Sequence, residues 1–215
     1  YVAHIQAITD FELPEINLDH IKAFTDGTGI LQHATYTIPD RSHGYCTDDN
    51  ARALLVTAMG QKYMPVNGWG LERLSGHYLG FLLYAHNEKE GRFRNFMTYS
   101  RQWAEAVGSE DAHGRSLWSL GKAVAFLDNP GHLAMSTTLF KKALNAIETF
   151  RSPRAIAFSL VGMHAYLEKF SGDSDVRRIR KVLADRLFTQ FKNNATDNWP
   201  WLENALNYAN GKLPH

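Results

Sequence analysis

The sequence predicts an all-α fold built from helical hairpins. Predicted helices that are apolar on nearly every face alternate along the chain with amphipathic helices. This pattern is expected when an outer layer of helices encloses an inner one. The inner helices also share a short motif near their first turn. With 44% hydrophobic and 21% charged residues, the composition is that of an ordinary globular protein, so we expect a single domain over residues 1–215.

The elements follow from periodicity and from breaking residues. Residues 1–15 show no clear period, and the segment from Gly29 to Leu55 is expected to be one irregular polar loop that runs into a helix capped by Thr47. A second long loop is expected over 87–108, and the sequence at 65–68 is expected to break a helix. The predicted helices cover 17–24, 48–63, 71–86, 112–127, 132–150, 154–170 and 173–191.

Three of these helices read as diverged repeats. The segments TDDNARALL, SEDAHGRSLW and RSPRAIAFS each place polar residues before an arginine and an apolar run, so Arg52, Arg115 and Arg154 are expected at matching positions. An array of such hairpins curls into an (α/α) toroid, in which one end of the inner helices lines a central cleft. The chain supplies only three to four hairpins and therefore predicts an incomplete ring.

Charge and cysteine content narrow the range of partners. The formal net charge of +1 at pH 7 gives no reason to expect nucleic acid or an anionic membrane as a partner. Cys46 is the one cysteine, so no intrachain disulfide is expected. Neither a secretory leader nor an apolar run long enough to span a bilayer is visible. These observations slightly favour the cytoplasm but leave the compartment open.

Four segments resemble a known group of proteins. They read HATYTIPDRSHGYCTDDNARAL, EGRFRNFMTYSRQW, GSEDAHGRSLWSLG and WPWLENALNYANGKLP. They resemble bacterial proteins, encoded beside or fused to glycosyltransferases, that are placed in the six-hairpin (α/α) toroid glycosidase-like superfamily. The resemblance covers about Asp26 to Pro214. Where the group usually has Tyr-Asp-Asn-Ala-Arg-Leu-Pro and then a helix, this chain has YANGKLP at 208–214 and stops one residue later.

The resemblance implies a carbohydrate-active domain, which we interpret as a glycoside hydrolase acting on a polysaccharide or oligosaccharide, with a β-glucan or mannan favoured. Such hydrolysis needs one carboxylic acid and one carboxylate. Toroid glycosidases commonly invert, which implies a wide separation between the two carboxyl groups. The alternative role for any one candidate is helix capping. Our acid/base candidates all lie near the start of an inner helix or in the last motif. The first choice is Asp48 or Asp49 together with Glu203, followed by Glu110 and Asp111.

A second set of side chains is expected to bind the sugar. Aromatic faces can stack on sugar rings, although core packing is the alternative for each phenylalanine. Arginines can hold hydroxyl groups, although a solvated face is their commoner role. The expected substrate-binding residues are His33, Tyr36, Arg41, His43, Tyr45, Asn50, Arg52, Arg94, Phe96, Tyr99, His113, Arg115, Trp199 and Trp201.

Two rival functions remain open. A non-catalytic glycan-binding or glycosyltransferase-accessory module would keep the aromatic residues and tolerate loss of the carboxylates. A sugar epimerase would use His33, His43 or His113 as proton carriers. These histidines match no standard metal-ligand spacing, so no metal or cofactor is expected. Cys46 is expected to pack rather than to act as a nucleophile.

The apolar inner helices also predict an assembly. In half a ring the first and last inner helices lack a neighbour, and large apolar patches on soluble monomers usually mark an interface. We therefore expect a homodimer formed through the open edges. The alternative is that residues 1–25 close the gap.

Overall fold

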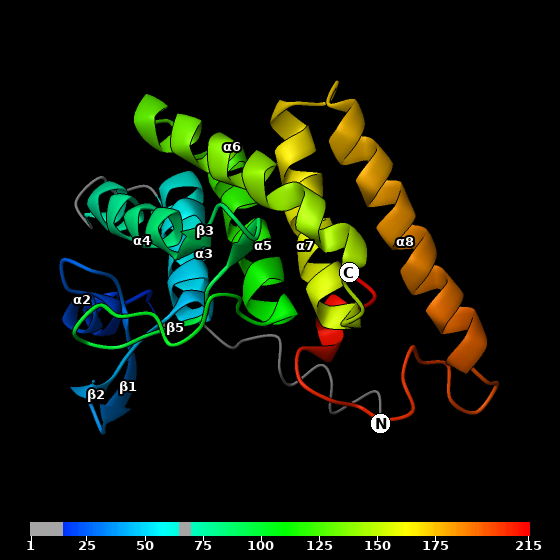
Figure 1. Ribbon diagram of the computed structural model, residues 1–215, viewed down its shortest axis with the longest axis horizontal. Helices are drawn as coiled ribbons and strands as arrows, with labels where there is room; N and C mark the ends of the chain where they lie inside the picture. The colour runs from blue at the N-terminus through cyan, green and yellow to red at the C-terminus, as the bar shows by residue number, and fades with distance from the viewer. Residues whose placement is uncertain (1–14, 65–69) are drawn as a thin grey trace.

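The computed structural model describes residues 15–64 and 70–215 of the chain. This part is mostly helical and also contains small antiparallel sheets (Figure 1). Its helices are α2 (Asp19–Phe24), α3 (Thr47–Tyr63), α4 (Leu71–Ala85), α5 (Glu110–Phe126), α6 (Pro130–Leu144), η3 (Asn145–Thr149), α7 (Pro153–Lys169), α8 (Ser174–Asn194) and η4 (Asn210–Lys212). None of these helices is long and apolar enough to cross a membrane.

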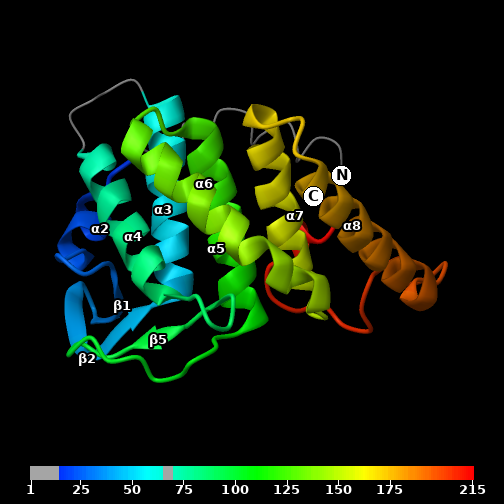
Figure 2. The same cartoon turned by 45° about the horizontal axis from the view of Figure 1, so that its top comes forward.

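The long helices form two layers. The helices α3, α5 and α7 pack side by side with α5 in the middle, and we call them the inner row (Figure 2). Each is followed along the chain by an antiparallel partner, and these partners, α4, α6 and α8, form the outer layer. The alternation of apolar and amphipathic helices in the sequence predicted this layering.

Glycine allows two inner helices to approach closely. A Cβ atom placed on Gly121 of α5 would lie 2.0 Å from the carbonyl oxygen of Gly162 in α7, and one placed on Gly162 would lie 2.3 Å from the carbonyl oxygen of Leu117. Neither distance is compatible with a side chain. Glycine at both positions therefore lets the two backbones touch, which fixes how α5 and α7 present their first turns.

The helix starts follow local capping rules, with one correction. The Ser109 hydroxyl accepts a hydrogen bond from the Ala112 N–H at the start of α5. At the start of α7 the Ser152 hydroxyl accepts one from the Ala155 N–H, and Pro153 occupies the first turn. Thr47 does not cap α3. Cys46 holds the cap position, and the Thr47 hydroxyl donates instead to the carbonyl oxygen of Arg94 at 2.6 Å.

The expectation of an all-α fold with two irregular loops was wrong in detail. The first loop contains β1 (Leu31–Thr35) and β2 (Ile38–Cys46), and the second contains β3 (His86–Asn87), β4 (Arg92–Phe93) and β5 (Phe96–Met97). The sheets have the orders β1-β2-β5 and β3-β4. A register shift between Leu31 and His33 interrupts the alternation of β1. The three strands of the second loop are only two residues long, so that loop carries no readable period.

The repeat alignment was correct for two arginines and wrong for the third. Arg52 and Arg115 each follow the first residue of their helix by five positions, whereas Arg154 follows the first residue of α7 by one. Arg154 therefore lies about one turn closer to the helix start than its supposed equivalents. Two expectations cannot be compared with the structure, because the helix break at 65–68 and most of the alternative plug at 1–25 lie outside the described residues.

Candidate functional site

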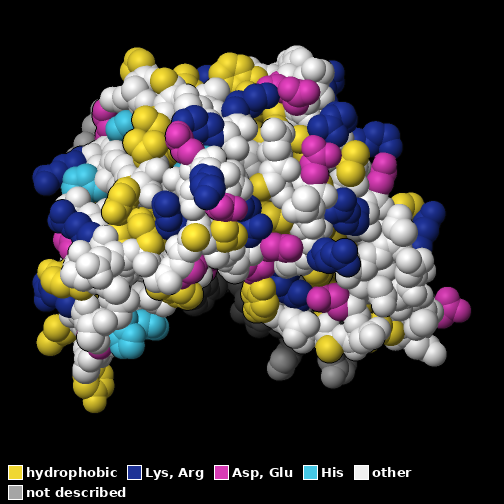
Figure 3. All heavy atoms as spheres, viewed as in Figure 1, with side chains coloured by type: hydrophobic (Ala, Val, Ile, Leu, Met, Phe, Trp, Pro, Cys, Tyr) yellow, Lys and Arg dark blue, Asp and Glu magenta, His cyan; other side chains and the backbone are white. Residues whose placement is uncertain are grey.

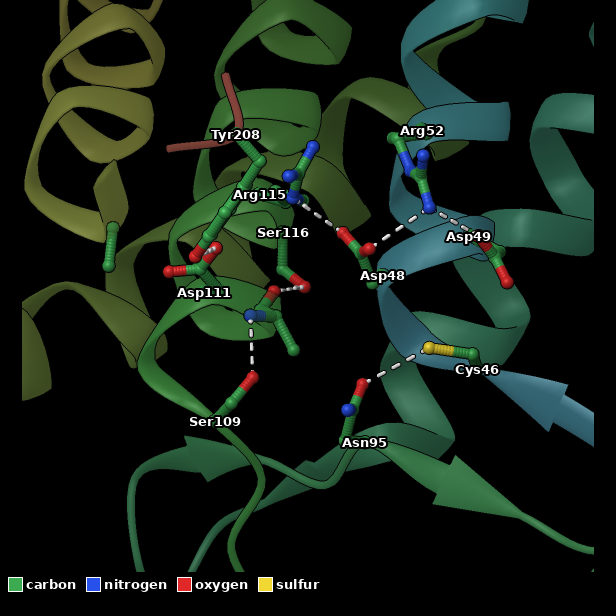
Figure 4. Close-up of polar contacts among 12 residues, drawn as sticks. Cys46, Asp48, Asp49, Arg52, Asn95, Ser109, Asp111, Arg115, Ser116 and Tyr208 are labelled. Carbon is green, nitrogen blue, oxygen red and sulfur yellow. Dashed lines mark hydrogen bonds and ion pairs between the residues drawn. The ribbon is translucent and has the colours of Figure 1, made fainter. Parts of the chain in front are cut away.

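The first turns of α3 and α5 place charged side chains against one another. Arg115 Nε lies 2.8 Å from Asp48 Oδ1, and Arg52 Nη2 lies 3.0 Å from Asp48 Oδ2 while also contacting Asp49. Figure 4 shows Arg52 between the two aspartates and Arg115 reaching across from α5. We call Asp48, Asp49, Arg52, Asp111 and Arg115 the acid row. It joins two helices that are distant in sequence but begin at the same end of the molecule.

Asp111 extends the acid row toward residues 195–215, which we call the C-terminal segment. Its Oδ2 accepts a hydrogen bond from the Tyr208 hydroxyl at 2.6 Å, and its Oδ1 accepts one from the Ser152 hydroxyl at 3.1 Å (Figure 4). Burial raises the pKa of Tyr208 to about 12, and the contact with Asp111 adds to this shift. The tyrosine therefore stays protonated at neutral pH and donates to the carboxylate.

The C-terminal segment is held on α7 by one buried arginine. Arg154 Nη1 donates to Glu203 Oε1 at 2.8 Å, its Nη2 lies 2.8 Å from Glu203 Oε2, and its Nε donates to the carbonyl oxygen of Tyr208. Arg154 Nη2 also donates to Asn210 Oδ1 at 3.0 Å. This bidentate pair with Glu203 raises the pKa of Arg154. Glu203 therefore holds the segment in place, which differs from the acid/base role expected for it.

Two carboxyl groups of the acid row are easier to protonate than usual. Burial raises the pKa of Asp48 although Arg115 and Arg52 oppose the shift, and burial raises the pKa of Asp49 against the opposing charge of Arg52. A carboxyl group with a raised pKa can act as a proton donor closer to neutral pH. This is the electrostatic property expected of a general acid.

The surface is hollowed at this end of the molecule. In the space-filling view, the lower edge is indented between the side of the β1–β2 hairpin and the side of the C-terminal segment (Figure 3). The inner helices α3 and α5 begin at this edge. Of the five expected acid/base residues, Asp48, Asp49 and Asp111 share the acid row.

Glu110 has a different role. Its Oε2 accepts hydrogen bonds from the backbone N–H groups of Arg151 and Ser152, at 2.9 and 2.7 Å. These groups lie at the entrance to α7, where free N–H groups and the helix dipole favour a negative charge. Glu110 therefore ties α5 to α7, as the capping alternative predicted in general terms.

Three expected substrate-binding residues are buried and serve the fold. Asn50 accepts a hydrogen bond from the Ile30 N–H at 2.9 Å and donates to the Cys46 carbonyl at 2.9 Å, which holds β1 on α3. The Tyr45 hydroxyl donates to Asp26 at 2.6 Å. Both side chains are almost fully inaccessible. These contacts correct the expectation that Tyr45 and Asn50 face a ligand.

His113 is the third expected substrate-binding residue that is buried. Its Nε2 donates to the Ala143 carbonyl oxygen at 2.9 Å, and its Nδ1 accepts from the Phe93 N–H at 3.4 Å, an arrangement that requires the neutral ring. Burial lowers its pKa to about 3. A ring that is fully buried and neutral cannot exchange protons with a sugar, so His113 cannot be the proton carrier of an epimerase.

The remaining candidates lie on the β1–β2 hairpin or on the neighbouring loop. The His33 and His43 rings are 4.5 Å apart, and Asp40 Oδ2 lies 3.6 Å from His43 Nε2. Tyr36 is 96% exposed at the hairpin turn. Arg41 lies over the Tyr99 ring at 5.9 Å. His33 also lines a pocket together with Asp49 and Arg52.

The other aromatic and basic candidates are dispersed. Phe96 of β5 is half-exposed beside Cys46. Arg94 donates to the Tyr84 carbonyl oxygen at 3.3 Å and lies over Trp103, away from the acid row. Trp199 donates through its indole N–H to the Glu203 carbonyl oxygen at 2.6 Å, and Trp201 packs against the core. Both tryptophans therefore shape the C-terminal segment.

Tyr208 is the functional candidate that the sequence reasoning missed. It was quoted only as part of the last motif, yet its hydroxyl meets Asp111 and its ring lies 4.7 Å below the Arg154 guanidinium. The sequence did offer a signal for Tyr208, because this tyrosine lies in the same motif as the candidate Glu203. Its partner, however, is 97 residues earlier in the chain, and sequence spacing cannot show such a contact.

Metal and thiol chemistry gain no support from the described residues. No group of three or more His, Cys, Asp or Glu side chains within them is arranged to hold a metal ion. Cys46 is buried, its thiol donates to Asn95 Oδ1 at 3.3 Å, and burial raises its pKa to about 12 (Figure 4). A thiol with this pKa does not form a nucleophilic thiolate at neutral pH.

No protein-family model matches the chain, and no curated protein matches it. Any assignment of function therefore rests on the site itself and on the sequence resemblance described above.

Proposed function

We propose that the protein is a carbohydrate-active domain of the glycoside hydrolase type, with the acid row as its catalytic site. The observation that carries this proposal is a network of ion pairs in which Arg52 contacts both Asp48 and Asp49. Arg115 reaches Asp48 from α5, the helix whose first turn also carries Asp111. Burial raises the pKa values of Asp48 and Asp49. Capping alone explains neither the shared arginines nor the tyrosine that meets Asp111.

Asp49 is the proposed acid and Asp111 the proposed base. Asp49 contacts one arginine and lines a pocket, whereas Asp48 is held by two arginines. Asp111 is held by two hydroxyl groups, and Glu203 and Glu110 are committed to structural contacts. Asp49 would protonate the glycosidic oxygen as its bond to the anomeric carbon breaks. Water would add to that carbon and give its proton to Asp111, yielding a sugar and an alcohol.

The proposed architecture is an (α/α) toroid of the six-hairpin type. Support comes from the hairpins α3–α4, α5–α6 and α7–α8, each with one inner and one outer helix, and from inner helices that begin at one end of the molecule. The exposed apolar residues Met59 and Tyr63 on α3 support an open edge that a second copy covers. The proposed partners are thus an oligosaccharide or polysaccharide and a second copy of the chain.

A non-catalytic glycan-binding module is the second candidate. The observation that favours it is the occupation of every expected acid/base carboxylate by arginine, hydroxyl or backbone partners. Such a site can present acceptors to sugar hydroxyls without transferring protons. Binding without turnover would distinguish this candidate from the hydrolase.

The test combines hydrolysis and binding. Reducing-sugar release from a panel of β-glucans, mannans and xylans is measured for the wild-type protein, for Asp49→Asn and for Asp185→Asn. Asp185 is the matched control because it lies on α8, is 63% exposed and forms an ion pair with the exposed Lys181. We expect Asp49→Asn to lose about 10²–10⁴-fold in rate and Asp185→Asn to match the wild type. Glycan binding by a wild-type protein that hydrolyses no member of the panel would favour the binding module.

A further inference from the structure

A pocket adjoins the acid row on the side of α2. It has a volume of about 390 Å³ and lies between α2, β1 and α3. This volume falls in the range of small-molecule sites. Asp49 and Arg52 line the pocket and also belong to the acid row, so a ligand in the pocket would lie directly against the proposed acid.

The walls of the pocket are held by contacts that need no ligand. Asn50 fixes Ile30 through hydrogen bonds to both its N–H and its carbonyl oxygen. Thr25, at the end of α2, hydrogen-bonds the buried Tyr78 hydroxyl at 2.7 Å. A Cβ atom on Gly29 would lie 2.3 Å from Asn50 Oδ1, so glycine permits this close approach of the chain to α3. The pocket is therefore preformed.

The lining of the pocket combines apolar and polar side chains. The helix α2 contributes Ile21 and Phe24, and β1 with the residue before it contributes Ile30 and Leu31. The helix α3 contributes Val56, which is 42% exposed although it is a large apolar residue. The polar lining residues Gln32, His33, Asp49 and Arg52 come from β1 and from the first turns of α3. The helix α2 adds His20, whose ring lies 4.1 Å from the Phe24 ring. One part of the pocket is thus apolar, and another part carries the proposed acid.

Resting on the proposed hydrolase function, we propose that this pocket binds an apolar leaving group, so that the substrate is a glycan carried on an alkyl or aryl aglycone. A sugar hydroxyl placed against Ile21, Phe24 and Val56 would lose its water and find no polar partner on those side chains. An alkyl or aryl group gains from the same surroundings. Its glycosidic oxygen would lie at Asp49, and the sugar would extend past Arg52 toward Asp48 and Asp111.

The first experiment measures binding without turnover. p-Nitrophenol is titrated into the protein and followed by NMR for the wild type, Val56→Ser and the control Val182→Ser. Val182 is 39% exposed and lies on α8. We expect saturable binding that Val56→Ser weakens about tenfold and Val182→Ser leaves unchanged. Absence of binding, or equal binding by the two variants, would overturn the proposal.

The second experiment separates this proposal from the hydrolase function. Cellotriose is titrated into the same three proteins, whose sedimentation is also measured. Tighter binding of cellotriose than of p-nitrophenol, with loss in Val56→Ser, would make the pocket a sugar site and overturn the proposal. A change in sedimentation caused by Val56→Ser would make it an interface between copies, with the same consequence. Binding of p-nitrophenol by a protein that hydrolyses no glycoside would support the pocket and refute the hydrolase.

Discussion

The buried pair Arg154–Glu203 gives a quantitative test of how the C-terminal segment is held. The same bidentate geometry occurs at Arg178–Glu148, with Nη–Oε distances of 3.0 and 2.9 Å. The side-chain exposures are 4% and 19% for Arg154 and Glu203, against 55% and 35% for Arg178 and Glu148. The two ion pairs therefore have similar geometry but differ in burial, and Arg154 also donates to the Tyr208 carbonyl oxygen and to Asn210.

Replacing each arginine by methionine removes the charge and keeps an unbranched side chain. Loss of one partner from a fully buried pair costs about 3–5 kcal/mol. Because 19% of the Glu203 side chain remains exposed, water solvates part of its charge, and we expect about 2–4 kcal/mol for Arg154→Met. For the exposed pair we expect about 1 kcal/mol or less from Arg178→Met.

Urea unfolding followed by circular dichroism measures both free energies. In a chain of this size each kcal/mol lowers the Tm by about 2–4 °C, so about 3 kcal/mol corresponds to a fall of about 6–12 °C. Equal losses of stability in the two variants would refute the reasoning, because burial would then not decide the cost of breaking the pair.

Three further predictions concern pH, the acid row and assembly. The His113 pKa of about 3 lies below the unfolded value of about 6.5, so the unfolded chain binds the extra proton and stability falls as the pH drops below 6.5. Between pH 7 and pH 5 the wild type should therefore lose about 2 kcal/mol more unfolding free energy than His113→Gln. Equal losses in the two proteins would contradict this. The raised pKa of Asp49 means that its ionised form is disfavoured in the folded state, so stability falls as the pH rises through the range between the unfolded and folded pKa values. Asp49→Asn should therefore unfold at a higher urea concentration than the wild type at pH 7. A lower urea midpoint would indicate that Asp49 stabilises the folded state. Light scattering over a dilution series should show a dimer that Tyr63→Glu dissociates, and a folded monomer at every wild-type concentration would exclude the open-edge interface.

The helices could be predicted from the sequence because their signals are local. A run such as Leu71–Ala85 shows its apolar stripe within one window, and Pro153 marks where its helix starts. The local hairpin of β1 and β2 was missed because a register shift between Leu31 and His33 interrupts its alternation. The strand β5 could not be predicted, because it pairs with β2 some fifty residues earlier, as in the pair Tyr45–Met97. Pairing at that separation leaves no period in either segment.

The site could be predicted only in part, for the same reason. The cluster of Asp48 and Asp49 before an apolar run was visible, and so was the matching position of Arg115. Which carboxylates would share partners was not visible, since Glu110 and Asp111 are adjacent in sequence yet meet backbone amides and a distant tyrosine, respectively. His113 also read as a proton carrier, because the sequence does not show that Phe93 and Ala143 enclose its ring.

The central claim is that Asp49 and Asp111 act as one catalytic pair, and a double-mutant cycle tests it most directly. The value of kcat/KM is measured on one responsive glycan for the wild type, Asp49→Asn, Asp111→Asn and the double variant. Residues that act as a unit lose activity non-additively. We therefore predict that the double variant is no more than about tenfold slower than the slower single variant. A double variant whose loss equals the product of the two single losses would contradict the claim, because the two carboxylates would then act independently.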